Sequence, residues 1–255
     1  MAIKLVVNGV AGAGKTDLLR TLGKETLVVS RDSKAFSLPL PHMLVDVFYD
    51  MTTLCYGGDK TVDGEKVHIN GVVDVMENYA TKFGEYPTNV AFDTVSQLFM
   101  DVIDNASQRP NVYGSQGAEV TKEMAIFTKF LHELELNGIN IILFNHVIEE
   151  KADGKKTGAY ISFGSGKFLE KGGFYSIVNE AVTLYEEGIH RKVHISGKDK
   201  LARTLLEDIP DTMYVENSRY PDKSKKLKEG EEYYSLAWHM NKLLEAQKSV
   251  EEWSL

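Results

Sequence analysis

Short apolar runs alternate with helix-like patterns along most of the chain. Runs rich in β-branched and other apolar residues predict strands at residues 3–8, 26–30, 90–92, 139–144, 181–185 and 192–196. Apolar residues at helical spacing predict helices at residues 17–22, 72–83, 97–103, 120–136 and 235–252. Such alternation is typical of an α/β fold, in which a mainly parallel central sheet is flanked by helices.

Three stretches interrupt this alternation. Prolines and glycines punctuate residues 34–70 around two possible strands and a hairpin, and residues 107–117 and 149–158 are polar enough to predict loops. Beyond about residue 220 the chain becomes dense in lysine and glutamate. We therefore expect a core domain over residues 1–217, followed by a charged linker and a C-terminal helical appendage over residues 218–255.

A glycine-rich motif joins the first predicted strand to the first predicted helix. Residues 9–16, GVAGAGKT, match the phosphate-binding pattern G-x-x-x-x-G-K-[ST]. Glycines let successive backbone N–H groups point into one concavity, where they bind phosphate oxygens. The expected nucleotide-binding residues are Gly9, Val10, Ala11, Gly12, Ala13, Gly14, Lys15, Thr16 and Asp17. A glycine-rich turn without a ligand is the alternative, and the strand–loop–helix context disfavours it.

A P-loop site also needs an acidic residue that positions Mg²⁺, and Asp93 is the candidate. Asp93 ends the apolar run at residues 90–92, and Thr94 and Ser96 follow it. We expect Thr16 and Asp93 to hold the metal ion, and Lys15 to reach the β- and γ-phosphates of ATP. Asp93 can also cap the helix that follows, and both roles can coexist.

The composition of the chain excludes several other kinds of site and several cellular locations. A single cysteine excludes an intramolecular disulfide, and the seven histidines lack metal-ligand spacing. The chain shows neither a run of about eighteen apolar residues nor a signal-like N-terminus, so we expect a cytoplasmic protein without membrane contact. A net charge of −8 argues weakly against nucleic acid, although binding depends on local fields rather than on the total charge.

Three classes of P-loop protein compete for this sequence. A GTPase-like switch is disfavoured because no N-K-x-D signature occurs. A nucleotide kinase is disfavoured because arginines are few and form no lid-like cluster. The third class, a RecA-like oligomeric ATPase, is favoured by the motifs that follow Asp93.

The order of these motifs resembles the RecA-like recombinase core over about residues 3–213. Asp93 and its following hydroxyl residues resemble the Walker B element, and the apolar run that ends in Asn145 and His146 is similar to the strand that carries the γ-phosphate sensor. The nearest resemblance is to the short phage-encoded RecA-like ATPases of single-strand annealing and recombination. The chain departs from RecA because it lacks a long N-terminal helical region and has Asn-His in place of Asn-Gln.

The resemblance implies further catalytic residues. Asp32 occupies the position of the glutamate that activates the attacking water, although it can also simply begin a turn. Asn145 or His146 would sense the γ-phosphate, with a capped strand end as the alternative. Arg203, or else Lys198 or Lys200, would complete the site of a neighbouring subunit, and a solvated basic turn is the competing interpretation.

The resemblance also implies two DNA-binding loops, at residues 108–117 and 147–173. The candidate DNA contacts in them are Arg109, Tyr113, Lys155, Lys156 and Lys167. Lysines interleaved with aromatic residues suit single strands, because cations bind phosphates and aromatic rings stack on bases. Ordinary polar loops are the alternative.

The function implied is Mg²⁺-dependent ATP hydrolysis coupled to single-stranded DNA in recombination or annealing. A homo-oligomer, as filament or ring, is expected, and a single-strand-binding protein is a further candidate partner. For a phage-encoded protein the expected location is the host cytoplasm. The alternatives are a P-loop kinase for a nucleotide or small molecule, and a nucleotide-dependent packaging or regulatory module without DNA contact.

Overall fold

The computed structural model of the chain describes residues 2–33, 37–108, 115–152, 155–162, 177–196, 202–217 and 220–251. The strands are β1 (Lys4–Gly9), β2 (Thr26–Ser30), β3 (His42–Leu44), β4 (Gly58–Val62), β5 (Glu65–Ile69), β6 (Asn89–Asp93), β7 (Asn140–Ala152), β8 (Lys155–Ser162), β9 (Glu180–Glu187), β10 (His190–His194) and β11 (Thr212–Val215). The helices are α1 (Lys15–Leu18), α2 (Met51–Tyr56), α3 (Val72–Phe83), α4 (Val95–Ser107), α5 (Ser115–Leu136) and α7 (Leu236–Glu251), with 3₁₀ turns η1 (Leu19–Thr21) and η4 (Pro221–Lys223).

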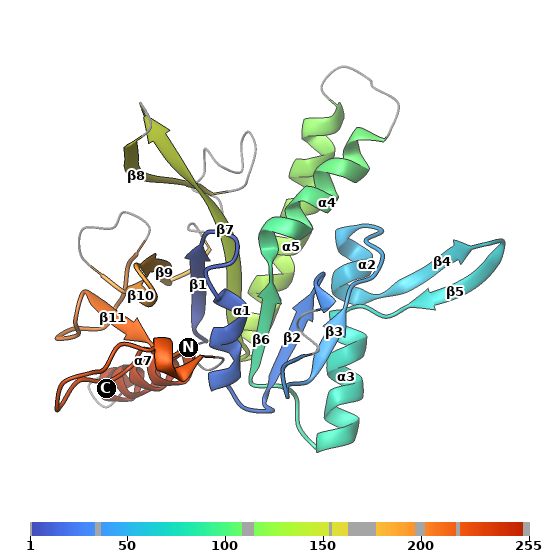
Figure 1. The fold of residues 1–255 in the computed structure, drawn as a ribbon. Helices are drawn as coiled ribbons and strands as arrows, with labels where there is room; N and C mark the ends of the chain where they lie inside the picture. The colour runs from blue at the N-terminus through green and yellow to red at the C-terminus, as the bar shows by residue number, and fades with distance from the viewer. Residues whose placement is uncertain are drawn as a thin grey trace.

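Among the described residues, nine strands form one sheet in the order β11-β10-β9-β1-β7-β6-β2-β3, with β8 paired to β7 (Figure 1). The strands from β9 to β3 in this order pair in parallel. Strands β8, β10 and β11 join by antiparallel pairing. The predicted α/β fold with a mainly parallel sheet and flanking helices is therefore confirmed.

Two apolar cores cover the two faces of the sheet, because successive side chains of a strand point to opposite sides. In β1, Val6 packs with residues of α2, α3, α4 and α5 on one face. Leu5 and Val7 pack with α1, η1 and α7 on the other face. Burial on both faces explains why the strands appear in the sequence as unbroken apolar runs rather than alternating ones.

The C-terminal helix α7 packs into the second core. Leu236 and Met240 are buried, whereas Leu244 is 39% exposed. A buried hydrogen bond joins His239 Nε2 to Glu180 Oε2 at 3.2 Å, and so ties α7 to the start of β9. The predicted boundary near residue 218 stays a prediction, but the helix beyond it shares a core with the sheet.

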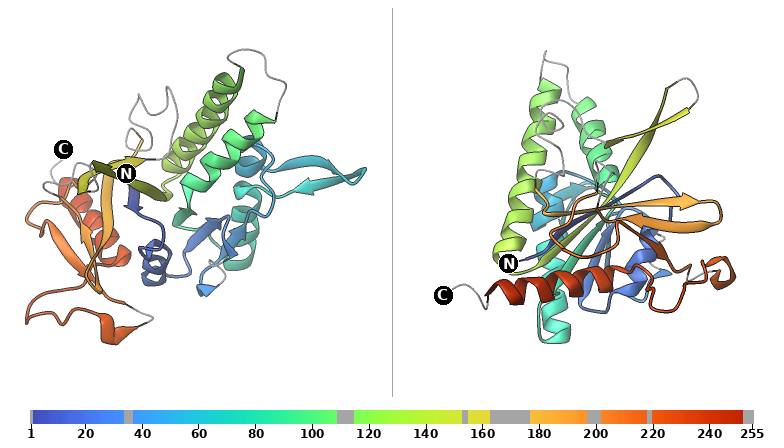
Figure 2. Two further views of the ribbon diagram at one scale, coloured as in Figure 1. Left: turned by 45° about the horizontal axis from the view of Figure 1, so that its top comes forward. Right: turned by 90° about the vertical axis from the view of Figure 1, so that its left-hand side faces the viewer.

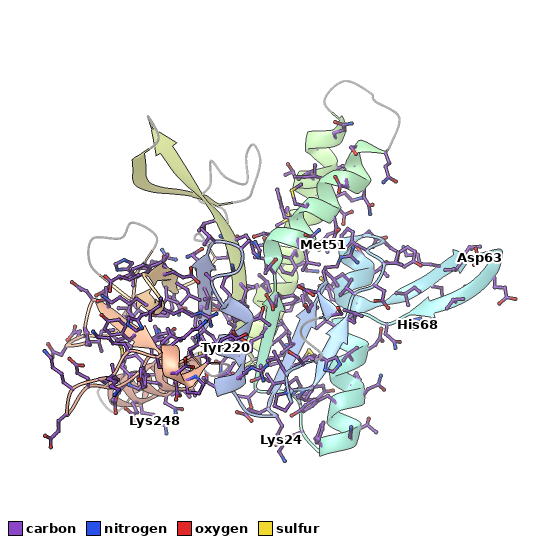
Figure 3. All side chains as sticks on the ribbon, in the orientation of Figure 1. Lys24, Met51, Asp63, His68, Tyr220 and Lys248 are labelled. Atoms are coloured by element: carbon purple, nitrogen blue, oxygen red, sulfur yellow. The ribbon has the colours of Figure 1, made fainter. Side chains whose placement is uncertain are left out.

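Three segments extend beyond the sheet (Figures 1 and 2). Helices α4 and α5 form a packed pair, strands β7 and β8 form a two-stranded arm, and β4 and β5 form a hairpin with Asp63 near its tip (Figure 3). The prediction of a polar loop at residues 149–158 was wrong, because residues 149–152 continue β7 and residues 155–158 begin β8. The backbone groups of the two strands pair with each other there.

Helix α2 is the other departure from the sequence pattern. Residues 37–70 contain β3 and the predicted β4–β5 hairpin, but residues 51–56 between them form the helix α2. Asp50 begins this helix, since its carboxylate accepts a hydrogen bond from the Thr53 backbone N–H at 2.7 Å. Within the described part of the chain, no helix combines the length and apolar character that a membrane span requires.

Candidate active site

The carboxyl ends of four parallel strands meet at one edge of the sheet, beside the glycine-rich loop. In register, Gly9 of β1 lies opposite His146 of β7, and Asp93 of β6 lies opposite Ser30 of β2. A cavity of about 770 Å³ opens there. It is lined by Ala11, Gly12, Gly14, Lys15, Thr16, Asp17, Arg31, Asp32, Ser33, Leu44, Asp46, Asp93, Thr94, Gln97, His146 and Arg191.

The glycine-rich loop adopts a conformation that requires glycine. Gly12 and Gly14 have φ angles of +83° and +93°, which side chains rarely tolerate. A Cβ atom on Gly9 would lie 3.0 Å from the Leu184 carbonyl oxygen, so the loop also needs glycine for close packing on β9. Lys15 Nζ donates to the carbonyl oxygens of Gly9 and Val10, at 2.7 and 2.9 Å. The ammonium group is thereby held over the loop.

Thr16 and Asp93 meet as expected for a metal site. Thr16 Oγ1 donates to Asp93 Oδ2 at 2.7 Å. Neighbouring ligand oxygens of an octahedral Mg²⁺ lie about 2.9 Å apart, so the two groups fit one such ion. Asp93 does not cap helix α4. The N-cap is Thr94, whose side chain accepts a hydrogen bond from the Gln97 N–H.

Burial controls the charge of two side chains that line the cavity. Burial lowers the pKa of Lys15 to about 8, although the nearby Asp93 carboxylate acts in the opposite direction. Burial, together with the positive charge of Lys15, lowers the pKa of His146 to about 4. The imidazole is therefore neutral at pH 7 and adds no positive charge beside the lysine.

The two predicted sensor residues differ in position. His146 lines the cavity, whereas Asn145 is fully buried behind it. The Asn145 side chain accepts from Ser96 Oγ at 2.8 Å and donates to Asn8 Oδ1 at 3.0 Å. Ser96 also accepts from the His146 backbone N–H at 2.7 Å. Asn145 therefore fixes β7 against β1 and α4, and His146 is the member of the pair that faces the cavity.

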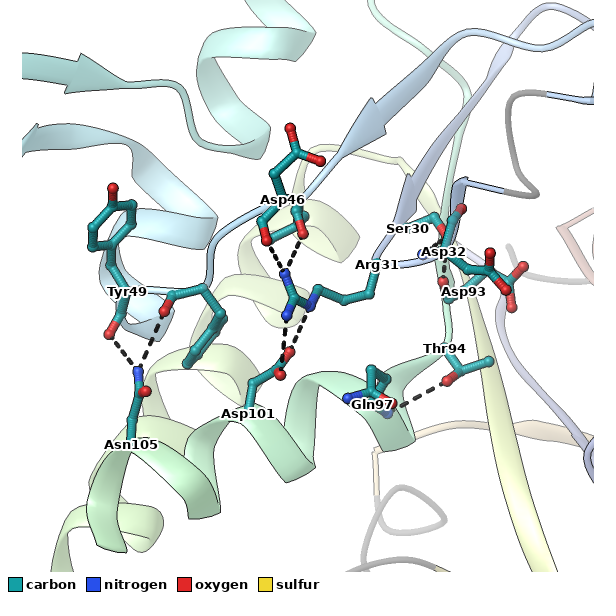
Figure 4. Close-up of polar contacts among 12 residues, drawn as sticks. Ser30, Arg31, Asp32, Asp46, Tyr49, Asp93, Thr94, Gln97, Asp101 and Asn105 are labelled. Atoms are coloured by element: carbon teal, nitrogen blue, oxygen red, sulfur yellow. Dashed lines mark hydrogen bonds and ion pairs between the residues drawn. The ribbon is translucent and has the colours of Figure 1, made fainter. Parts of the chain in front are cut away.

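Asp32 lines the same cavity as Lys15 and Asp93, as its predicted role in activating water requires. Ser30 Oγ donates to the Asp93 carbonyl oxygen at 2.7 Å and accepts from the Asp32 backbone N–H at 3.0 Å (Figure 4). Arg31 forms an ion pair with Asp101 at 2.8 Å and donates to the Asp46 carbonyl oxygen at 2.7 Å. The segment that carries Asp32 is thus pinned to β6 and α4.

The remaining candidates lie away from this cavity or beyond what the structure describes. Arg203 pairs with Ala181 near the amino end of β9, and its guanidinium donates to the Val178 carbonyl oxygen. Its role in a neighbouring subunit's site stays a prediction. Arg109, Tyr113, Lys167, Lys198 and Lys200 lie outside the described residues. Lys155 and Lys156 belong to β8, where the structure describes the backbone but not these side chains.

Arg191 is a cavity residue that the sequence analysis missed, as are Arg31, Ser33, Leu44, Asp46 and Gln97. Arg191 Nη1 lies 3.1 Å from Asp17 Oδ2. No motif marks this arginine, but a turn at Gly188, whose φ is +64°, sets the register of β9 and β10. Recognition of that hairpin would have placed Arg191 at the same edge of the sheet as the glycine-rich loop.

Comparison with known proteins identifies a family for most of the chain. A family model described as an AAA domain matches residues 1–200, which include the glycine-rich loop, Asp32, Asp93 and His146. No curated protein matches the chain.

Proposed function

The chain belongs to the AAA domain family of P-loop ATPases, and we propose that it is a RecA-like ATPase that acts on single-stranded DNA in phage recombination or annealing. Nucleotide binding and ATP hydrolysis are what the family has in common. The RecA-like character, the DNA substrate and a homo-oligomeric assembly are the parts that go beyond it.

One observation carries the proposal. Strand β7 runs from Asn140 to Ala152, with a shift of register against β8 between Glu149 and Lys151, so the strand that presents His146 to the nucleotide cavity continues into the β7–β8 arm (Figure 1). Three lysines belong to the arm: Lys151 of β7 lies opposite Lys156 of β8 in the pairing, and Lys155 is the residue before Lys156. A change at the γ-phosphate end of the cavity therefore has a direct route, along one strand, to a lysine-rich projection.

The side chains of the cavity divide the work of hydrolysis. In this proposal Lys15 neutralises phosphate charge, and Asp32, which lines the same cavity, orients or deprotonates the attacking water. Thr16 and Asp93 are the residues that would hold Mg²⁺, and the ion would supply positive charge to offset the negative charge of the phosphates. Because the His146 imidazole is neutral, it can form or lose a hydrogen bond to the γ-phosphate without a change in its own charge.

The proposal is tested by DNA binding of variants with reversed charge on the arm. Lys155→Glu with Lys156→Glu should weaken binding of a labelled single strand at least tenfold in anisotropy titrations at low salt, because counterion release scales with the cations lost. The matched control is Lys66→Glu with Lys82→Glu, which makes the same change of net charge on β5 and α3.

The control pair should bind DNA within about twofold of the unmodified protein. Binding should also be tighter with ATP than with ADP, and should weaken as salt is added. Equal effects of the two double variants, or no binding with either nucleotide, would contradict a DNA-binding role for the arm.

A kinase is the second candidate function, and one observation favours it. A further cavity of about 370 Å³ lies beside the nucleotide cavity and shares Leu44 and Asp46 with it. An acceptor molecule bound there would lie next to the γ-phosphate end of the site. Transfer of labelled phosphate from ATP to a nucleoside monophosphate, in the absence of DNA, would support this alternative.

A further inference from the structure

An arginine from a neighbouring hairpin reaches the glycine-rich loop of its own chain. In the parallel pairing of β1 with β9, Gly9 lies opposite Leu184. In the antiparallel pairing of β9 with β10, Arg191 lies opposite Glu186, beyond Leu184 in the direction of the loop. The backbone register alone therefore brings Arg191 to the edge where the loop begins.

The side chain of Arg191 lies directly against the loop. A Cβ atom built on Gly14 would lie 2.5 Å from the guanidinium carbon and 2.5 Å from Nη1. The guanidinium thus occupies the space that glycine leaves open, and it lines the cavity together with Lys15. Its side chain is 18% exposed, so it is partly withdrawn from water but still accessible to a ligand.

The position of Arg191 identifies the part of a nucleotide that it would meet. Thr16 and Asp93 mark the metal-binding side of the cavity, toward β6 and β7. Arg191 contacts Gly14 and Asp17 on the opposite side, toward β9 and β10. In the general P-loop pattern the lysine reaches the β- and γ-phosphates and the loop backbone cradles the α- and β-phosphates, so the guanidinium would face the α-phosphate.

We propose that Arg191 is a nucleotide-binding residue that contacts the α-phosphate in its own subunit, held in place by Asp17. This inference rests on the proposed nucleotide site. A guanidinium presents a planar array of N–H donors that matches phosphate oxygens. Asp17 Oδ2 engages Nη1 at 3.1 Å and orients the plane. The other N–H groups of the guanidinium, which lines the cavity, would donate to the phosphate.

The expected effect distinguishes this role from contact with the γ-phosphate. ATP and ADP both carry an α-phosphate, so loss of Arg191 should lower the affinity for both nucleotides by the same factor. Loss of a residue that contacts the γ-phosphate would lower the affinity for ATP and leave the affinity for ADP unchanged. For Arg191→Gln we expect the Kd of each nucleotide to rise about tenfold, since one charge-assisted hydrogen bond is lost.

Arg20→Gln is the matched control. Arg20 Nε lies 3.6 Å from Asp17 Oδ1, so it pairs with the same carboxylate. Arg20 is not one of the residues that line the cavity. Each substitution removes one positive charge that pairs with Asp17. The two arginines differ because only Arg191 lines the nucleotide cavity.

The test is titration of each variant with a fluorescent ADP analogue and with a non-hydrolysable ATP analogue, with melting temperatures measured with and without ADP. The proposal expects weaker binding and a smaller ADP-induced rise in melting temperature for Arg191→Gln, with both near normal for Arg20→Gln. A loss confined to the ATP analogue, or equal Kd values for both variants and the unmodified protein, would overturn it. If the unmodified protein binds neither nucleotide, the proposed site itself fails and this inference with it.

Discussion

At the scale of single residues, the protein environment sets the charge that the cavity offers to a polyphosphate. Lys15 is held by two backbone carbonyl oxygens and is 5% exposed, so its ammonium group has lost much of its hydration. The same environment keeps His146 neutral. The positive charge of the loop on this side therefore depends on one lysine whose pKa lies near physiological pH.

This dependence predicts that nucleotide affinity falls as pH rises above about 8. The pKa of free Lys15 is lowered to about 8, so below it the protonated, binding-competent form predominates. Above it, each nucleotide bound must be accompanied by uptake of a proton. The Kd for ADP should then rise by up to about tenfold per pH unit, as measured by titration between pH 7 and 9.5.

Lys15→Arg is the control for this pH dependence. A guanidinium stays protonated throughout the range, so any binding that this variant retains should be independent of pH. A Kd that is constant from pH 7 to 9.5 in the unmodified protein would contradict the account of Lys15.

His146 provides a second prediction at this scale. Because the imidazole is neutral, an uncharged amide should replace it, whereas removal of its hydrogen-bonding groups should not be tolerated. We expect His146→Ala to lower kcat about 10²-fold, and His146→Gln to restore most of that loss. Steady-state phosphate release measures both. Equal activities of the two variants would show that His146 makes no functional contact with the γ-phosphate.

At the scale of helices and strands, the pattern of apolar residues was sufficient to predict the strands of the central sheet but not the segments that extend beyond it. The P-loop strand was predictable because burial on both faces leaves an unbroken apolar run at β1. The β7–β8 arm was not predictable from the same signal, since its strands stabilise each other through backbone hydrogen bonds. An Asp-Gly pair at residues 153–154 was the available hairpin signal.

The site was predictable where one local motif places several groups, and not where register between strands does so. The motif at residues 9–16 and the strand end at Asp93 were enough to predict the loop, the lysine and the juxtaposition of Thr16 with Asp93. Arg191 and Ser30 reach the same cavity only through pairing of strands distant in sequence. Asn145 and His146 adjoin in sequence, but strand geometry turns one inward and the other toward the cavity.

The packing of α7 makes a prediction at this scale. Leu236 is fully buried in the core beneath the sheet, so Leu236→Ala should lower the free energy of unfolding by about 2–5 kcal/mol in urea titrations. Leu244 lies on the same helix and is 39% exposed, so Leu244→Ala should change it by less than about 0.5 kcal/mol. A small effect of Leu236→Ala would instead support a separate C-terminal appendage.

At the scale of the whole molecule, the acidic balance and the proposed DNA contact are compatible. A net charge of −8 excludes a protein that is basic over its whole surface. It leaves room for a lysine-rich arm, because fields near a surface depend on local charge within about 10 Å at ordinary salt. Such a protein should bind DNA at one place and under nucleotide control, rather than indiscriminately.

The most direct test of the account is ATP hydrolysis measured with and without single-stranded DNA. Release of phosphate from MgATP should be slow alone, should rise several-fold with single strands, and should disappear in Asp93→Asn, which weakens the metal site. Turnover that is unaffected by DNA, with the phosphate recovered on a nucleoside monophosphate, would contradict a DNA-dependent ATPase and indicate a kinase.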